Sequence, residues 1–124
     1  MARRYLTIKR VAEALDVPSA HIHRWCDRLG LIPEPGSHNR IRLTVREAIA
    51  LRAACTLAGR NEVHLASAAA NAILTTSSRW LFVRLDQHLE GDTADELLDK
   101  WREIGTPTGT VLDTRRLGLV YVGR

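Results

Sequence analysis

Lysine, cysteine and aromatic side chains are all scarce in this sequence. The two cysteines, Cys26 and Cys55, form no Cys-x-x-Cys pair, so nothing supports a zinc finger or a disulfide-stabilised scaffold. Aromatic residues make up 5% and hydrophobic residues 45%, which predicts a packed core of Leu, Val, Ile and Ala. No apolar run reaches the roughly 18 residues of a membrane span, and the opening MARRYLTIKR lacks the apolar stretch of a secretion signal. We therefore expect a soluble, cytoplasmic protein with no membrane partner.

Positive charge is concentrated in the first half of the chain. Residues 1–60 carry 11 Lys and Arg against 5 Asp and Glu, whereas residues 61–124 carry 7 against 9. Apart from Lys9 and Lys100, all of these cations are arginines, whose planar fork suits phosphate and guanine. A GC-rich genome would produce the same preference for arginine without any function. The asymmetry predicts that the front half of the chain meets a polyanion.

Three helices are predicted in the front half. Thr7 is a suitable N-cap for the first, and Ser19 for a second helix that ends near Leu29 before Gly30. Thr44 and Glu47 fit a capping box that opens a third helix, which runs to about Ala58. The side chains expected to point inward are Ile8, Val11, Ala12 and Leu15 in the first helix, and Ala48, Leu51, Ala54 and Cys55 in the third.

The rear half predicts an alanine-rich helix followed by a small β-α-β unit. Asn61 is the expected cap of the alanine-rich helix, which ends near the TTSS run at residues 75–78. WLFVRL predicts a strand, QHLEGD a turn, and TVLD and LGLVYV two closing strands. Thr93 and Glu96 fit a capping box for a helix between them. The stripe expected to be buried on that helix consists of Ala94, Leu97, Leu98, Trp101 and Ile104.

The second helix separates into an apolar face and a basic face. At about 100° per residue, Ile22, Trp25, Cys26 and Leu29 share one stripe. The other faces carry His21, His23, Arg24 and Arg28. A helix fits the major groove of B-DNA, and side chains near its N-terminus reach the base edges. Arg24 and His21 are therefore candidates for base contacts, although an outward Arg is equally compatible with simple solvation.

A hairpin with an arginine-bearing strand is predicted after the second helix. LIPEPGSHN, residues 31–39, holds two prolines and a glycine and predicts a loop or a hairpin turn. In the alternating segment RIRL, residues 40–43, Arg40 and Arg42 should point one way while Ile41 and Leu43 point to the core. Two guanidinium groups on one face can hold phosphates or enter a minor groove.

The ordered set of these features resembles a known DNA-binding domain. YLTIKRVAEALDVPSAHIHRWCDRLGLIPEP, followed by NRIRLTVREAIALR, is similar to the N-terminal domain of the MerR family and to the related excisionase-type winged helices. The resemblance covers about residues 5–58. Its positions are Thr7, Ile8, Val11, Ala12, Val17, Ile22, Trp25, Gly30-Leu31-Ile32-Pro33, Glu47, Leu51 and Arg52.

Two features depart from the MerR pattern. Asn39-Arg40-Ile41-Arg42-Leu43 replaces the usual Gly-Tyr-Arg-x-Tyr wing, and His23 stands where an Arg is frequent. No heptad pattern follows the alanine-rich helix, so the family's coiled-coil dimer and the promoter untwisting that depends on it are not predicted here.

The sequence and the resemblance together predict an α+β protein with two parts. Residues 1–76 would form a MerR-like winged helix-turn-helix with the alanine-rich helix, and residues 79–124 a small unit for dimerisation or for a protein or small-molecule effector. The resemblance implies a bacterial or phage transcription regulator, associated with the nucleoid, that binds double-stranded DNA. We expect a homodimer, since a single DNA-binding domain offers few base contacts. Bases would be contacted by Arg24 and His21, with His23 beside them, and phosphates by Arg3, Arg4, Arg28, Arg40 and Arg42.

Two alternatives to a regulator remain open. The first is a phage-type excisionase or architectural factor that bends DNA. The second is an antitoxin-like adaptor that binds a protein and no longer uses its winged helix on DNA. An unpaired strand edge in LGLVYVGR could pair with another chain.

Neither a metal site nor a catalytic site is expected. His21 and His23 point about 200° apart on a helix, and Cys26 lies on the apolar stripe, so the three cannot converge on one ion. The acidic residues of the rear half fit helix caps and a solvated face, and no nucleophile lies beside a base. No glycine-rich phosphate loop is present. We expect no cofactor and no enzymatic activity.

Overall fold

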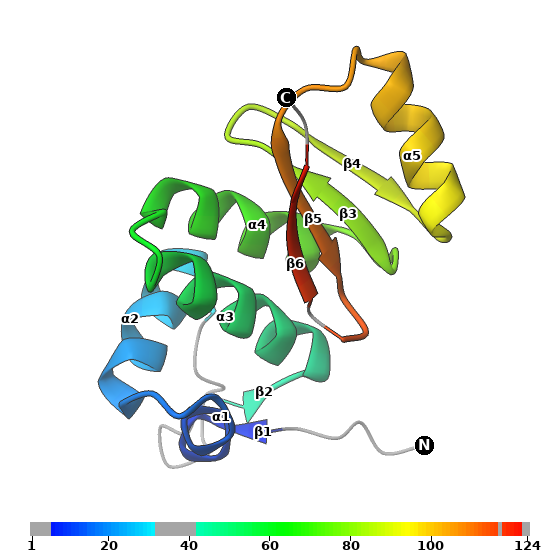
Figure 1. The fold of residues 1–124 in the computed structure, drawn as a ribbon. Helices are drawn as coiled ribbons and strands as arrows, with labels where there is room; N and C mark the ends of the chain where they lie inside the picture. Colours follow the sequence, from blue (N-terminus) through cyan, green and yellow to red (C-terminus); the bar gives the residue numbers. More distant parts are fainter. Residues whose placement is uncertain (1–5, 32–41, 117, 123–124) are drawn as a thin grey trace, which may run out of the picture.

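Helices dominate the first part of the chain and antiparallel strands the second (Figure 1). The computed structural model describes residues 6–31, 42–116 and 118–122, within which it contains five helices and six short strands. The elements are β1 (Leu6–Thr7), α1 (Ile8–Leu15), α2 (Ser19–Leu29), β2 (Arg42–Leu43), α3 (Val45–Ala58), α4 (Val63–Thr75), β3 (Trp80–Val83), β4 (His88–Gly91), α5 (Ala94–Glu103), β5 (Gly109–Asp113) and β6 (Gly118–Val122). The protein is therefore α+β, as expected.

The ends of α1 and α2 follow from local hydrogen bonding. Thr7 caps α1 as predicted, because its hydroxyl accepts a hydrogen bond from the backbone N–H of Arg10 at 3.2 Å. The prediction for Ser19 is wrong: Pro18 occupies the N-cap position without a side-chain bond, and Ser19 is the first helical residue. The fixed φ of proline lets the chain enter the helix there. Gly30 ends α2 with a left-handed φ of 71°, as predicted.

Helices α3 and α4 form a close pair built on alanine. The capping box is confirmed, since Thr44 accepts from the Glu47 N–H at 3.1 Å and Glu47 accepts from the Thr44 N–H at 2.7 Å. Asn61 does not cap α4; it adopts a left-handed φ of 63° in the connecting turn, and Glu62 is the N-cap. Asparagine tolerates this conformation, so it makes the turn instead. The buried alanines are Ala50, Ala53, Ala54, Ala66, Ala69, Ala70 and Ala72.

The rear part is a four-stranded antiparallel sheet in the order β4-β3-β5-β6, with α5 between β4 and β5 in the chain. The expected β-α-β unit is thus wrong, because most of QHLEGD forms the strand β4 and not a turn. The turn is confined to the residues between Arg84 and Gln87, whose backbones are joined by a 2.9 Å hydrogen bond. Leu89 lies opposite Phe82 across the resulting hairpin. Gly91 and Asp92 are residue types that favour turns, so the segment predicts a turn, whereas pairing with β3 makes it a strand.

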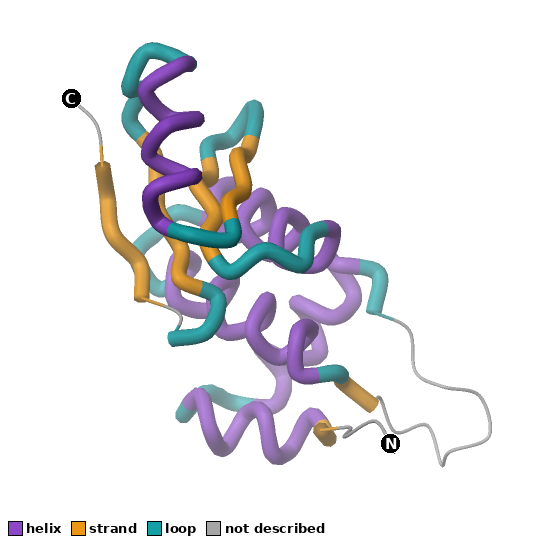
Figure 2. The backbone as a smooth tube through the Cα atoms, turned by 90° about the vertical axis from the view of Figure 1, so that its right-hand side faces the viewer, coloured by secondary structure: helices purple, strands orange, loops and turns teal. Residues whose placement is uncertain are grey.

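The sheet lies between α4 and α5 (Figures 1 and 2). On one face, Leu81, Val83 and Leu112 belong to the same buried cluster as α1–α4, so one core runs through both predicted parts. On the other face, Phe82 and Val111 line a small hollow with α5. The predicted stripe of α5 is only partly buried: Leu97 is buried and Trp101 half-buried, while Ala94, Leu98 and Ile104 are exposed. In the described chain this helix packs chiefly on β3 and β4.

None of the helices in the described part of the chain combines the length and the apolar character that crossing a bilayer requires.

Candidate nucleic-acid interface

A short corner joins α1 to α2. Asp16 adopts a left-handed φ of 55° and ends α1, and the Val17 N–H donates to the Ala12 carbonyl at 3.1 Å. Pro18 then starts α2, and its carbonyl accepts from the His21 N–H at 3.0 Å. Figure 1 shows α1 almost end-on and α2 from the side, so the two helices cross at a large angle. The corner leaves one long face of α2 in solvent.

The two faces of α2 match the periodicity of the sequence. Ile22, Trp25 and Cys26 are buried in the core, and Leu29 is half-buried against it. His21, His23, Arg24 and Arg28 are all exposed. The buried stripe holds the helix to α1, α3 and α4, so the exposed side chains project from a fixed support.

Three of the four exposed basic or imidazole side chains are brought together. His21, Arg24 and Arg28 line one hollow of about 230 Å³, with Trp25 at its wall and Ala58 and Val63 opposite. The Arg28 guanidinium lies 5.2 Å from the centre of the Trp25 ring, a distance that allows a cation–π contact. His23 does not line this hollow.

The wing residues are described only in part. Backbone pairing of β1 with β2 sets Leu6 opposite Leu43 and Thr7 opposite Arg42. Leu43 is buried, as the alternation predicts. The backbone of Arg42 thus lies beside the cap of α1, but its side chain is outside the description. Arg3, Arg4, Arg40 and the turn at residues 32–39 also lie outside the described residues.

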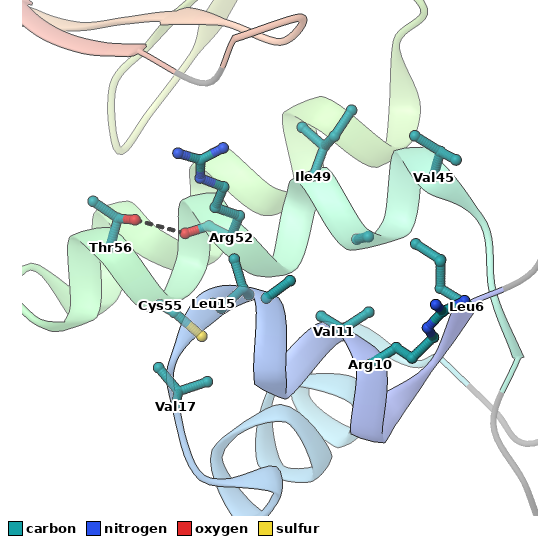
Figure 3. A pocket seen from close by; sticks show the side chains of 12 residues that line it. Leu6, Arg10, Val11, Leu15, Val17, Val45, Ile49, Arg52, Cys55 and Thr56 are labelled. Carbon is teal, nitrogen blue, oxygen red and sulfur yellow. Dashed lines mark hydrogen bonds between the residues drawn. The ribbon is translucent and has the colours of Figure 1, made fainter.

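An apolar groove that the sequence did not predict separates α1 from α3 (Figure 3). It encloses about 740 Å³ and is lined chiefly by aliphatic side chains. The exposed Arg10 and Arg52 lie at its border, one from each helix. Helical periodicity indicates that both arginines are exposed. Their shared groove could not be predicted, because it depends on how two helices distant in sequence pack.

A second hollow of about 590 Å³ lies between the start of α4 and the sheet. Val63, Leu65, Val83 and Leu85 form apolar parts of its lining, and Thr110 of β5 also lines it. Within the described residues the buried Thr110 hydroxyl has no hydrogen-bond partner. An effector site in residues 79–124 stays a prediction.

The cysteines and histidines do not form a reactive cluster in the described chain. Burial, with smaller contributions from Asp27 and Glu47, raises the pKa of Cys26 to about 11. Burial also raises the pKa of Cys55. Among residues 6–31, 42–116 and 118–122, no three His, Cys, Asp or Glu side chains are grouped so that they could hold a metal ion. The expectations of no cofactor and no enzymatic activity stay predictions.

Comparison with models of protein families, with curated proteins and with solved structures finds no match for this chain.

Proposed function

We propose that this protein binds double-stranded DNA in a sequence-specific manner and regulates transcription, with a winged helix-turn-helix of the MerR type as its DNA-recognition domain. The observation that carries this proposal is the grouping of His21, Arg24 and Arg28 on the exposed face of α2. The opposite face of the same helix is buried in the core. A basic, rigidly supported helix of this kind has the shape and charge that the major groove accepts.

The position of each side chain along α2 suggests its role. His21 lies in the first turn of α2, the part of a recognition helix that reaches base edges, and Arg24 lies one turn further on, at the middle of the helix. Arg24 can donate two hydrogen bonds to the O6 and N7 atoms of a guanine. Arg28, in the last turn and over Trp25, would contact a phosphate. His23 would contact DNA from the other side of the helix.

The wing would contact the DNA backbone. β2 is held beside the start of α1 by its pairing with β1, and the capping box of Thr44 fixes the entry into α3. We propose that Arg42, with Arg40 and the N-terminal Arg3 and Arg4, holds phosphates or enters a minor groove.

The test is binding to a random-sequence duplex pool over a series of salt concentrations, followed by sequencing of the retained DNA. We expect the logarithm of the affinity to fall linearly with the logarithm of salt concentration. Arg42→Ala should reduce the slope by about one unit. Arg24→Ala should weaken binding to the selected site by about 1–3 kcal/mol and relax the selected motif.

Arg102→Ala is the matched control, because Arg102 is an exposed arginine on the distant α5. It should leave both the motif and the salt slope unchanged. The proposal fails if the wild type shows no salt-sensitive binding, and a tight protein partner would then support the adaptor alternative. Selection of repeated direct sites with bending of the DNA would instead support the excisionase alternative.

A further inference from the structure

The two edges of the four-stranded sheet differ. β4 and β6 are the outer strands. β4 is shielded, because α5 packs on it and the Lys100 ammonium donates a hydrogen bond to the Glu90 carbonyl at 2.7 Å. β6 has no such cover: no described element lies beyond it in the sheet, and Figure 2 shows it along the outer side of the molecule.

The strand register shows which backbone groups point away from each edge. The Arg84 N–H donates to the Gln87 carbonyl, and facing pairs in an antiparallel ladder alternate between bonded and non-bonded. The pair Leu81–Glu90 is therefore non-bonded, so the Glu90 carbonyl points out of the sheet. This is the carbonyl that Lys100 occupies.

The same alternation can be followed across the sheet to β6. The β3 residues whose backbone N–H and C=O groups point away from β4 form hydrogen-bonded pairs with Leu112 and Thr110 of β5. Val111, between them, directs its backbone groups to the opposite side and forms a hydrogen-bonded pair with Val120 of β6. The hydrogen bond from the Thr114 N–H to the Arg79 carbonyl, at 2.8 Å, fits the same alternation of bonded and non-bonded pairs between β3 and β5. The backbone N–H and C=O groups of Leu119 and Tyr121 consequently point outward from the free edge of β6.

The sequence of β6 lacks the features that usually protect an edge strand. Gly118–Val122 reads GLVYV, with no proline and no charged residue, and β-branched and aromatic types are frequent in it. By contrast, β4 carries His88 and Glu90. An unblocked edge of this kind is a template for pairing with another strand.

We propose that β6 pairs with β6 of a second copy of this chain, antiparallel and about a two-fold axis at Val120, so that one sheet runs through both copies. Leu119 and Tyr121 are equidistant from Val120, so the outward groups of Leu119 meet those of Tyr121 in the second copy. The strand is thus complementary to itself, as a two-fold interface requires.

Charge favours the antiparallel arrangement over the parallel one. The exposed Arg115 and Arg116 lie in the loop directly before β6. Parallel pairing would place the arginines of both copies side by side, whereas antiparallel pairing sends them to opposite ends of the interface.

The first test compares three proline variants by light scattering and by sedimentation equilibrium in DNA-free buffer. The wild type should be a dimer. Leu119→Pro and Tyr121→Pro each remove a backbone N–H that points outward from the edge. Both variants should keep the melting temperature of the wild type and should raise the dimer dissociation constant by about tenfold or more. Val120→Pro is the matched control: it removes an N–H that faces β5 and should lower the melting temperature instead. A wild type that is monomeric throughout, or edge prolines that dimerise as tightly as the wild type, would overturn the proposal.

A second measurement needs no variant and covers the case in which a proline disrupts folding. Amide hydrogen exchange at Leu119 and Tyr121 should slow as the protein concentration rises, whereas Val120 should be protected at every concentration. Exchange at Leu119 and Tyr121 that does not depend on concentration would also overturn the pairing. Both measurements are made without DNA, so the outcome is separate from that of the proposed function.

Discussion

The Arg79 guanidinium holds both carboxylate oxygens of Asp113, with Nε–Oδ1 at 2.9 Å and Nη2–Oδ2 at 3.0 Å. Arg79 immediately precedes β3 and Asp113 ends β5, so the ion pair closes one end of the two central strands. The same guanidinium lies 5.1 Å from the centre of the Trp80 ring. Asp113 also accepts a hydrogen bond from the Arg115 N–H at 3.1 Å, which ties the ion pair to the loop before β6.

The ion pair predicts a contribution to stability that is lost in acid. The hydrogen bonds from Arg79, followed by those from the backbone N–H groups of Arg115 and Arg116, lower the pKa of Asp113 below its ordinary value of 3.8. A carboxyl group whose pKa is lower in the folded state stabilises the fold fully above that ordinary value, and the contribution disappears as pH falls through the lower folded value. We expect Asp113→Asn to lower the melting temperature at pH 7 and the difference from wild type to shrink towards pH 2.

Asp99→Asn is the control for this measurement. Asp99 and Arg102 are 3.8 Å apart and mostly exposed, so their pair should contribute little to stability. Melting curves of the three proteins from pH 2 to pH 7 test the assignment. A pH-independent difference between wild type and Asp113→Asn would show that the ion pair is not its source.

Arg46 is predicted to fasten α3 to the last turn of α4 and to the segment between α4 and β3. Its Nε donates to the Ile73 carbonyl at 2.8 Å, and its Nη2 donates to the Thr76 hydroxyl at 3.1 Å and to the Ser78 carbonyl at 3.2 Å. Hydrogen bonds from a charged donor are among the stronger ones, so Arg46→Met should cost about 2 kcal/mol in the free energy of unfolding. Chemical denaturation measures this directly.

Arg46→Lys distinguishes the geometry of the guanidinium from its charge. Lysine keeps the charge but cannot reach three acceptors with a planar fork, so it should recover only part of the loss. Arg52→Met is the matched surface control on the same helix, since Arg52 is exposed. Equal effects of the Arg46 and Arg52 substitutions to Met would contradict the fastening role.

The two thiols are predicted to differ in reactivity. Cys26 is fully buried and its pKa is raised to about 11, so at pH 8 only about one molecule in a thousand would carry the thiolate even if reagent could enter. Cys55 is half-buried, and Figure 3 shows its sulfur pointing towards Val17 at the α1–α3 groove. Ellman's reagent should label Cys55 slowly in the native protein and Cys26 only after unfolding. The single variants Cys55→Ala and Cys26→Ala assign each phase, and rapid native labelling of Cys55→Ala would contradict the prediction.

Much of the local structure could be predicted because it depends on residues close in sequence. The Thr7 and Thr44 caps, the end of α2 at Gly30, and the buried stripe at Ile22, Trp25 and Cys26 all follow from spacings of three or four residues. The predictions at Ser19 and Asn61 were each wrong by one residue. Pro18 takes the N-cap position of α2 instead of Ser19, and the left-handed turn at Asn61 moves the N-cap of α4 to Glu62.

The candidate site was predictable only as a list of exposed residues. The periodicity of α2 determines that His21, Arg24 and Arg28 are exposed, but not that Ala58 and Val63 close a hollow around them. That hollow depends on how the α3–α4 corner packs against α2. Trp25 was predicted only as a core residue; its contact with Arg28 is a relationship that their three-residue spacing could have indicated.

By itself, the sequence determined the approximate position of each helix, the polarity of each helix face and the concentration of positive charge in the first half of the chain, because these depend on neighbours along the chain. Only the tertiary structure decided that β4 is a strand, that Arg46 reaches carbonyls about thirty residues away, and that β6 lies at the outer edge of the sheet. A four-residue strand such as β4 has too little propensity of its own, so it forms where β3 offers a ladder of donors and acceptors and α5 covers it.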